Sequence, residues 1–232
     1  MAFEAILFDC DGVLVDSETI YVQVEREHLA RIGLQYDLDE YMDRFQGLGS
    51  EDFWAALDRD HRELGKGSLP ENFFEELDVA TMRRMETELL EISGIKQLLN
   101  GHEGLRAVAS SSRLQRLIQK LRHTGLFSYF DPHIYSGEQV KNGKPAPDLF
   151  LFAAQKLGVS PARTLVIEDS SNGVKAGLAA GMTVWGFVGG GHSHDTHAAQ
   201  LEEAGAHQVV DTHQNLAALL KNGGPVGRRS NP

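Results

Sequence analysis

Residues 5–12 read Ala-Ile-Leu-Phe-Asp-Cys-Asp-Gly, and they are the most informative stretch of the chain. The apolar half predicts a buried β-strand. Asp9 and Asp11 follow at once, and residues two apart in an extended segment point the same way. Both carboxylates can therefore enter one site where the strand ends, and they repel each other unless a proton or a cation intervenes. The alternative is an ordinary polar turn after a strand, since Asp-Gly is a common turn dipeptide.

The composition is that of a globular chain with an acidic balance. The 232 residues are 41% apolar and 24% charged, which permits one large domain or one domain with an inserted module. With 22 basic and 33 acidic side chains the net charge is −11, which argues against nucleic acid as a partner. An anionic substrate is still possible, because a bound cation and a local lysine can reverse the field in a site.

The sequence also gives an expectation about the compartment. Cys10 is the only cysteine, which excludes an intrachain disulfide framework and fits a reducing environment. No apolar run is long enough for a signal peptide or a bilayer span. We therefore expect a cytoplasmic protein without a membrane partner. The oligomeric state stays open, with a monomer favoured.

Short apolar segments alternate with helical stretches, which is typical of a parallel sheet with helices on both faces. The expected strands are residues 3–8, 105–109, 132–135, 163–168, 182–187 and 207–210. The expected helices between them are residues 112–123, 147–158, 171–180, 196–204 and 214–220. The fold class is therefore α/β.

One interval interrupts this alternation and predicts an inserted helical module. The expected helices there are residues 18–33, 38–45, 51–63 and 71–90. The domains that follow are a core of residues 1–16 and 92–222, the helical module 17–91, and a disordered tail 223–232.

Polar residues follow the other expected strands, at the sheet edge where open α/β folds gather their ligands. Ser110 and Ser111 precede an expected helix, where hydroxyls and free backbone N–H groups form an anion site, although an ordinary serine N-cap is the simpler explanation of these residues taken alone. Lys144 stands between a glycine and a proline and can hold a phosphate as a fixed charge, or be a solvated loop lysine. Glu168 and Asp169 suit a magnesium site or the compensation of a helix dipole.

Together these segments resemble the signature motifs of the haloacid-dehalogenase-like hydrolase superfamily. Residues 9–14 match its first motif and Ser110 its second, Lys144 matches the third, and Glu168 with Asp169 match the fourth. The helical insert resembles the small cap of the β-phosphoglucomutase-like branch, and the chain is also similar to that branch's sugar-phosphate phosphatases, including 6-phosphogluconate phosphatase. The resemblance implies a Rossmann-like parallel-sheet core with an inserted helical cap.

The resemblance also implies a reaction on a small phosphorylated metabolite. Asp9 would attack phosphorus to form an aspartyl-phosphate. Asp11 would protonate the leaving alcohol and then deprotonate the attacking water. Ser110, Ser111 and Lys144 would hold the phosphoryl oxygens.

The cofactor that the resemblance implies is Mg²⁺. It would bind at Asp9, at the Asp11 backbone carbonyl and at Asp169, with Glu168 close by. The helical cap would close over the substrate and exclude water, as lids do.

Within this family Asp11 argues against dehalogenation and phosphonate hydrolysis, because those branches lack an acidic residue there. Mutases of the β-phosphoglucomutase type hold a second phosphate with an arginine in a cap loop, and Ser50 stands at that place here. Tyr21 replaces a histidine of the mutase hinge. Arg44 could serve instead, and Gly47 and Ser50 complete the candidate substrate residues of the cap. We expect a phosphatase for small sugars or sugar acids, with a hexose-phosphate mutase as the alternative.

Two further interpretations stay open. A non-catalytic binding protein on the same scaffold is a minor alternative, disfavoured by the intact pair Asp9 and Asp11. His192, His194 and His197 follow three glycines and could suggest a metal site, but a mobile polar loop is the simpler explanation, and we assign these histidines no function.

Overall fold

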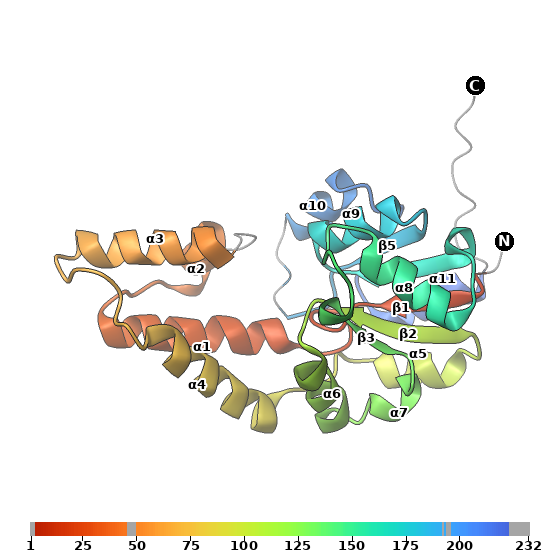
Figure 1. The fold of residues 1–232 in the computed structure, drawn as a ribbon, viewed down its shortest axis with the longest axis horizontal. Helices are drawn as coiled ribbons and strands as arrows, with labels where there is room; N and C mark the ends of the chain where they lie inside the picture. The colour runs from red at the N-terminus through yellow and green to blue at the C-terminus, as the bar shows by residue number, and fades with distance from the viewer. Residues whose placement is uncertain (1–2, 46–49, 192, 194–195, 223–232) are drawn as a thin grey trace. The chain divides into compact units, whose positions relative to one another are not determined.

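The computed structural model describes residues 3–45, 50–191, 193 and 196–222. The chain divides into two compact units (Figure 1). We call Met1–Glu18 with Leu89–Pro232 the core unit, and Thr19–Glu88 the helical unit. The expected tail 223–232 lies outside the described residues.

A six-stranded parallel sheet forms the centre of the core unit, in the order β3-β2-β1-β4-β5-β6. The expected α/β fold with a parallel sheet is therefore confirmed. The central strands are runs of buried apolar residues, because both faces of such a sheet are covered. The strands are β1 Ala5–Phe8, β2 Leu105–Ser110, β3 Ile134–Ser136, β4 Thr164–Glu168, β5 Thr183–Phe187 and β6 Gln208–Val210.

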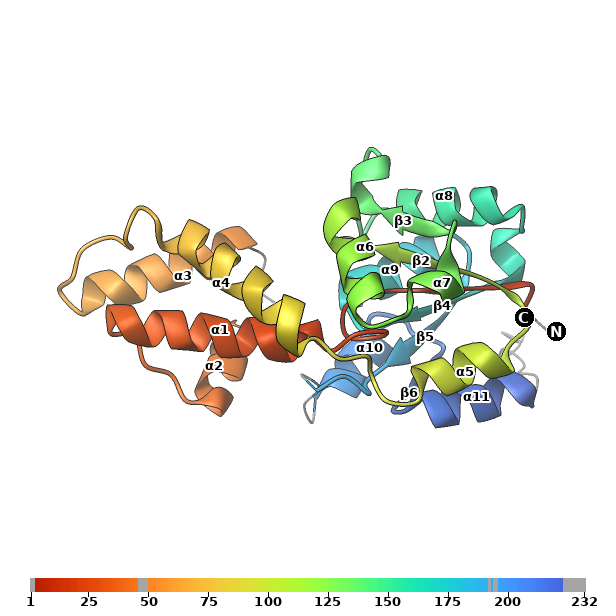
Figure 2. The ribbon, with the colours of Figure 1, turned by 90° about the horizontal axis from the view of Figure 1, so that it is seen from below.

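Helices cover both faces of this sheet (Figure 2). Leu7 points to a cluster formed with α8, α9 and α10, while its neighbour Phe8 meets Phe130 of α7 edge-on at 5.8 Å on the other face. Two short helices, α5 and α7, were not expected from the sequence. The helices are α5 Ile95–Gly101, α6 Leu114–His123, α7 Phe127–Phe130, α8 Asp148–Leu157, α9 Ser171–Ala179, α10 His197–Glu203 and α11 His213–Lys221, with 3₁₀ turns at Gly137–Gln139 and Pro161–Arg163.

The chain leaves and re-enters the core unit along two adjacent segments. The backbone N–H of Asp16 donates to the carbonyl of Leu90 at 3.0 Å, and that of Ile92 donates to Leu14 at 2.9 Å. Gly12 has φ 72°, a left-handed conformation that favours glycine, and it lets the chain turn immediately after Asp11. The two backbone hydrogen bonds hold the segment that leaves the core unit beside the segment that re-enters it.

The helical unit has its own aromatic core. It contains α1 Ser17–Ile32 except for its first two residues, which belong to the core unit, together with α2 Leu38–Phe45, α3 Ser50–Glu63 and α4 Phe73–Glu88. Phe45 packs against Tyr36, Tyr41 and Phe53 with ring centroids 5.1, 5.2 and 5.3 Å away. These side chains come from α2, from α3 and from the loop before α2, so the unit is held together by tertiary packing rather than by helix propensity.

No helix among the described residues combines the length and the apolar character that a bilayer crossing requires.

Candidate active site

Asp9 lies directly beyond β1, in the middle of the sheet. Its backbone N–H donates to the carbonyl of Ile167 on β4 at 2.9 Å, so the β1–β4 pairing continues to this residue. The register pairs Phe8 with both Val108 and Ile167 on the flanking strands. The ends of β1, β2 and β4 therefore lie level, which brings the polar residues after each strand to one edge.

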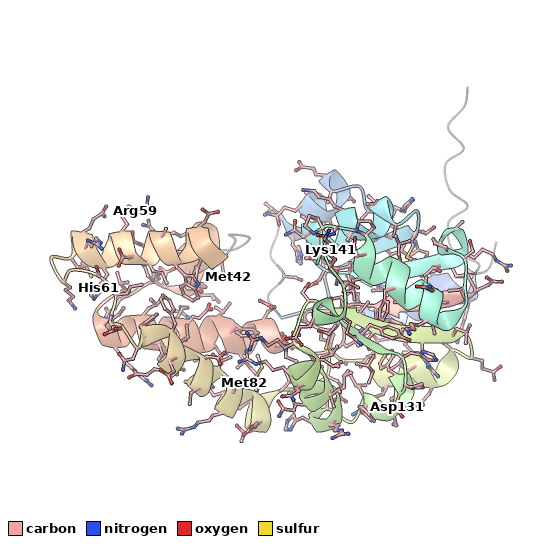
Figure 3. The ribbon with its side chains drawn as sticks, in the orientation of Figure 1. Met42, Arg59, His61, Met82, Asp131 and Lys141 are labelled. Atoms are coloured by element: carbon pink, nitrogen blue, oxygen red, sulfur yellow. The ribbon has the colours of Figure 1, made fainter. Side chains whose placement is uncertain are left out.

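Lys144 brings the third polar segment to this edge. Its Nζ donates to Asp9 Oδ1 and, at 2.6 Å, to Glu168 Oε1. The lysine side chain is only 5% exposed, and its ammonium group also lies 4.9 Å from the ring centroid of Phe150. By contrast, Lys141 on the same loop is exposed to solvent (Figure 3). The structure therefore selects Lys144 as the buried lysine of this loop.

The carboxylate of Asp11 is held by side chains from three different segments. Oδ1 accepts hydrogen bonds from Ser17 Oγ and Lys120 Nζ. Oδ2 accepts one from Ser112 Oγ at 2.9 Å. Lys120 is 4% exposed and Asp11 is 19% exposed, so this ion pair is largely withdrawn from water.

The serines after β2 occupy different environments. Ser110 is buried at the end of the strand, and its Oγ accepts a hydrogen bond from the backbone N–H of Ser112 at 3.1 Å. Ser111 is exposed. Helix α6 begins at Leu114 rather than at residue 112, so these serines form a loop before the helix. Polar backbone groups of such a loop are available to a phosphate.

Glu168 and Asp169 have distinct partners. Glu168 is fully buried, and its Oε2 accepts hydrogen bonds of 2.9 Å from both the N–H and the hydroxyl of Ser170. A Cβ on Gly173 would lie 1.8 Å from this carboxylate, so only glycine fits there. The backbone carbonyl of Asp169 accepts a hydrogen bond from Nε2 of His197 at 2.6 Å. Glu168 thus supports Lys144, whereas His197 fixes the backbone of Asp169.

The electrostatics of the site are those of an acidic cluster with too few cations. Burial raises the pKa of Asp9 well above its usual value, and Glu168 and Asp169 add to the rise while Lys144 opposes it. Burial and the neighbouring Glu168 likewise raise the pKa of Asp169. Burial alone would also raise the pKa of Asp11, but Lys120 and the two serine hydroxyls outweigh it, and the pKa is lowered.

These charges fit a divalent cation. The carboxylates of Asp9, Asp11, Glu168 and Asp169 face the two ammonium groups of Lys120 and Lys144, and the raised pKa values of Asp9 and Asp169 mark the uncompensated charge. Within the described ranges, no three His, Cys, Asp or Glu side chains converge as a complete metal site. The carboxylate oxygens are the donor type that Mg²⁺ uses, since it binds through one or two carboxylates and takes its other oxygen ligands from water and substrate phosphate.

The candidate residues of the helical unit are less informative. Arg44 forms an ion pair with Asp60 of α3, and its guanidinium lies 5.6 Å from the ring centroid of Phe45. Gly47 lies outside the described residues, and Ser50 is the first residue of α3. Of the three histidines expected in a mobile polar loop, His192 and His194 also lie outside the described residues, whereas His197 is the buried first residue of α10, so the expectation was wrong for it.

Lys120 is not among the residues expected at the site, and His197 was expected to have no function there. Lys120 did leave a signal, because it follows Leu117 by three residues and precedes Leu121 on the buried face of α6, where a lysine is unusual. The contact of His197 with Asp169 joins residues 28 positions apart, and no local pattern indicates it.

The chain is similar to a known protein family, to known phosphatases and to solved hydrolase structures. Residues 3–181 match the family described as haloacid dehalogenase-like hydrolase. The chain is 34% identical over 220 residues to a phosphorylated carbohydrates phosphatase of Thermotoga maritima, a match that covers 93% of this chain and 98% of that protein. It is 28% identical over 209 residues to the 6-phosphogluconate phosphatase of Escherichia coli, covering 86% and 93%. A family hydrolase from Deinococcus radiodurans, solved with bound phosphate and sodium, is 41% identical with a TM-score of 0.83, covering 95% and 96%.

Proposed function

The chain belongs to the haloacid dehalogenase-like hydrolase family and is a phosphatase of that family, and we propose that it hydrolyses small phosphorylated sugars or sugar acids with Mg²⁺ through an aspartyl-phosphate. The observation that carries the proposal is the contact of Lys144 with Asp9. A buried ammonium group beside this carboxylate lowers the repulsion between a nucleophilic anion and an anionic phosphate.

The reaction begins at Asp9. A carboxylate oxygen attacks phosphorus, the bond from phosphorus to the sugar oxygen breaks, and its electron pair leaves with that oxygen. Asp11 in its protonated form donates its proton to the leaving oxygen, which departs as the alcohol. Lys144, the hydroxyl of Ser110 and the backbone amides at Ser111 hold the phosphoryl oxygens as charge shifts among them.

Water completes the cycle. Its oxygen attacks the phosphorus of the aspartyl-phosphate, the bond to Asp9 breaks, and the electron pair returns to the Asp9 carboxylate. Asp11 accepts a proton from the water and so regains the proton that it donated. Inorganic phosphate leaves, and both aspartates have the form in which they began.

Mg²⁺ would be held by the carboxylates of Asp9 and Asp169 and by the backbone carbonyl of Asp11. When bound, it supplies positive charge that neutralises the carboxylates and the phosphoryl oxygens. Glu168 stays close, but its oxygens are already bonded to Lys144 and Ser170, so we give it the task of holding the lysine.

The substrate class rests on the relatives and on Arg44. The two curated relatives described above are phosphatases of phosphorylated carbohydrates and of 6-phosphogluconate. A mutase needs a cation for a second phosphate, and the charge of Arg44 is already paired with Asp60. Hydrolysis is thus favoured over a mutase or a non-catalytic protein. We also propose a reducing compartment such as the cytoplasm, because the single cysteine forms no intrachain disulfide.

The test is release of inorganic phosphate from a panel of sugar and sugar-acid monophosphates, with and without Mg²⁺. We expect turnover of at least one such substrate that depends on Mg²⁺ and is absent in Asp9→Asn. Turnover no greater than that of Asp9→Asn for every member would overturn the proposal. Isomer formation stimulated by a sugar bisphosphate, without phosphate release, would establish the mutase instead.

A further inference from the structure

Lys120 is a buried cation that the proposed reaction has not used. It lies on α6 with its side chain 4% exposed, between the buried leucines Leu117 and Leu121. Removing an ammonium group from water is costly unless the group is paired and hydrogen-bonded. Its Nζ meets that condition by donating to Asp11 Oδ1 and, at 3.2 Å, to Ser112 Oγ.

The contacts of Lys120 form a closed cycle around Asp11. Lys120 donates to Asp11 and to Ser112, and Ser112 donates in turn to the other carboxylate oxygen of Asp11. Ser17 adds a further hydrogen bond to Oδ1. Donors on both oxygens hold the carboxylate in one orientation.

The two aspartates of the site therefore have separate lysines. Lys144 pairs with Asp9 and also with Glu168, whereas Lys120 pairs with Asp11 from helix α6. The pairing of Lys144 with Asp9 places a positive charge beside the proposed nucleophile. The second places a positive charge beside a group that must take a proton from water in one half of the reaction and give a proton to the sugar in the other.

We propose that Lys120 is a positioning residue that acts through Asp11 and serves the hydrolysis of the aspartyl-phosphate. The inference rests on the proposed function. In this step the water oxygen bonds to phosphorus, the bond from phosphorus to Asp9 breaks with its electron pair on Asp9, and a water proton passes to the Asp11 carboxylate. Lys120 holds that carboxylate as an oriented acceptor before the water attacks.

The test is a kinetic double-mutant cycle with Lys120→Met and Asp11→Asn, using p-nitrophenyl phosphate and a sugar phosphate that the wild type turns over. p-Nitrophenolate leaves without a proton, so this substrate isolates the second half of the reaction. We expect Lys120→Met to lower kcat for both substrates by roughly 10- to 100-fold, the range for supporting residues of a site. kcat/KM should change little, so KM should fall together with kcat, and the p-nitrophenol burst should grow because phosphoenzyme accumulates.

The cycle also separates positioning from a structural effect. Since Lys120 acts through Asp11, Lys120→Met should cost nothing further in the Asp11→Asn background. Lys120→Arg should restore part of kcat, because the cation is retained. Lys175→Met, at an exposed lysine on α9, is the matched control for the loss of one charge.

Folding is checked by thermal melting, because Lys120→Met leaves a buried carboxylate unpaired. If that variant does not fold, the cycle is run with Lys120→Gln, which keeps a donor for Asp11, and with the double variant Lys120→Gln/Asp11→Asn, which lacks both charges. The inference would be overturned if Lys120→Met left kcat unchanged, or if its loss added to that of Asp11→Asn. It would also be overturned if the defect were confined to the sugar phosphate and the burst did not grow. A wild type no more active than Asp9→Asn would overturn the proposed function, and the inference with it.

Discussion

Nζ of Lys144 donates a 2.6 Å hydrogen bond to Oε1 of Glu168, and both side chains are buried. The other oxygen of the glutamate accepts hydrogen bonds from Ser170, so the lysine is bonded to a carboxyl group that is itself held at both oxygens. A lysine stem is flexible in solution, and this pair removes that freedom before the substrate arrives. The ammonium group therefore remains at Asp9 without further reorganisation.

Replacement of Lys144 by methionine removes this charge and keeps most of the stem. We expect kcat/KM for a sugar phosphate to fall by about 10²- to 10³-fold, the effect of removing one preorganised charge-stabilising donor. Steady-state phosphate release measures it. Lys141→Met is the matched control on the same loop, where the side chain is exposed, and it should retain wild-type kinetics. Equal losses in the two variants would contradict the assignment of Lys144.

Asp169→Asn tests the surplus of negative charge. Without metal the variant should melt at a higher temperature than the wild type, because it removes one of the buried carboxylates whose pKa is raised by burial and by its neighbours. With Mg²⁺ the wild type should gain stability by mass action, and the variant should gain much less. Melting curves with EDTA and with increasing Mg²⁺ measure both effects. A variant that is destabilised without metal and keeps the full response to Mg²⁺ would refute the cation site.

His213 makes stability depend on pH. It is fully buried at the start of α11, stacked at 4.5 Å on Phe187, and burial lowers its pKa from 6.5 to about 4. Between these values the unfolded chain binds a proton that the folded chain does not. The free energy of unfolding therefore decreases as the pH falls from 6.5 to about 4, by roughly 3 kcal/mol from this residue, and it is unaffected above that range.

His213→Gln isolates this contribution. Asp9 and Asp169 have raised pKa values and shift stability in the opposite direction at low pH, so the quantity to compare is the difference between wild type and variant. We expect the wild type's advantage to shrink as the pH falls from 6.5, measured by urea unfolding at each pH. His123→Gln, at an exposed position on α6, should leave the profile unchanged. Parallel profiles for wild type and His213→Gln would rule out this origin.

Tyr36→Phe tests the polar network of the helical unit. The Tyr36 hydroxyl donates to Asp60 Oδ2 at 2.6 Å, and Asp60 also pairs with Arg44. Loss of a hydrogen bond to a partly buried carboxylate should lower the free energy of unfolding by about 1–2 kcal/mol. Denaturant unfolding measures it, with Tyr129→Phe as the control. No loss of stability would show that water replaces the hydroxyl at Asp60.

The sheet could be predicted from the sequence because its strands are short apolar runs that end in polar residues. The same property placed Asp9, Lys144 and Glu168 at one edge, and the family resemblance drawn from these residues is confirmed by the family match. Helices α5 and α7 escaped prediction because they span seven and four residues, too short for a helical pattern to show.

The hydrogen-bond partners of Asp11 could not be predicted from local sequence patterns. Lys120 and Asp11 are 109 positions apart, and the helical periodicity of α6 shows only that the lysine lies on the buried face. Which carboxylate it meets depends on how α6 packs on β3 and α7 in the core unit. Such pairings require coordinates, since the sequence alone contains several acidic candidates at the same edge.

The central claim is that Asp9 becomes phosphorylated. The most direct measurement is to mix Asp11→Asn, in which hydrolysis of the phosphoenzyme should be slow, with Mg²⁺ and p-nitrophenyl phosphate, whose leaving group needs no proton from Asp11. Acid quenching, digestion and mass spectrometry then locate any covalent phosphoryl group. The account predicts one phosphoryl group on the peptide that contains Asp9, and none in Asp9→Asn/Asp11→Asn. A phosphoryl group on another residue, or phosphate release by Asp9→Asn at the wild-type rate, would contradict it.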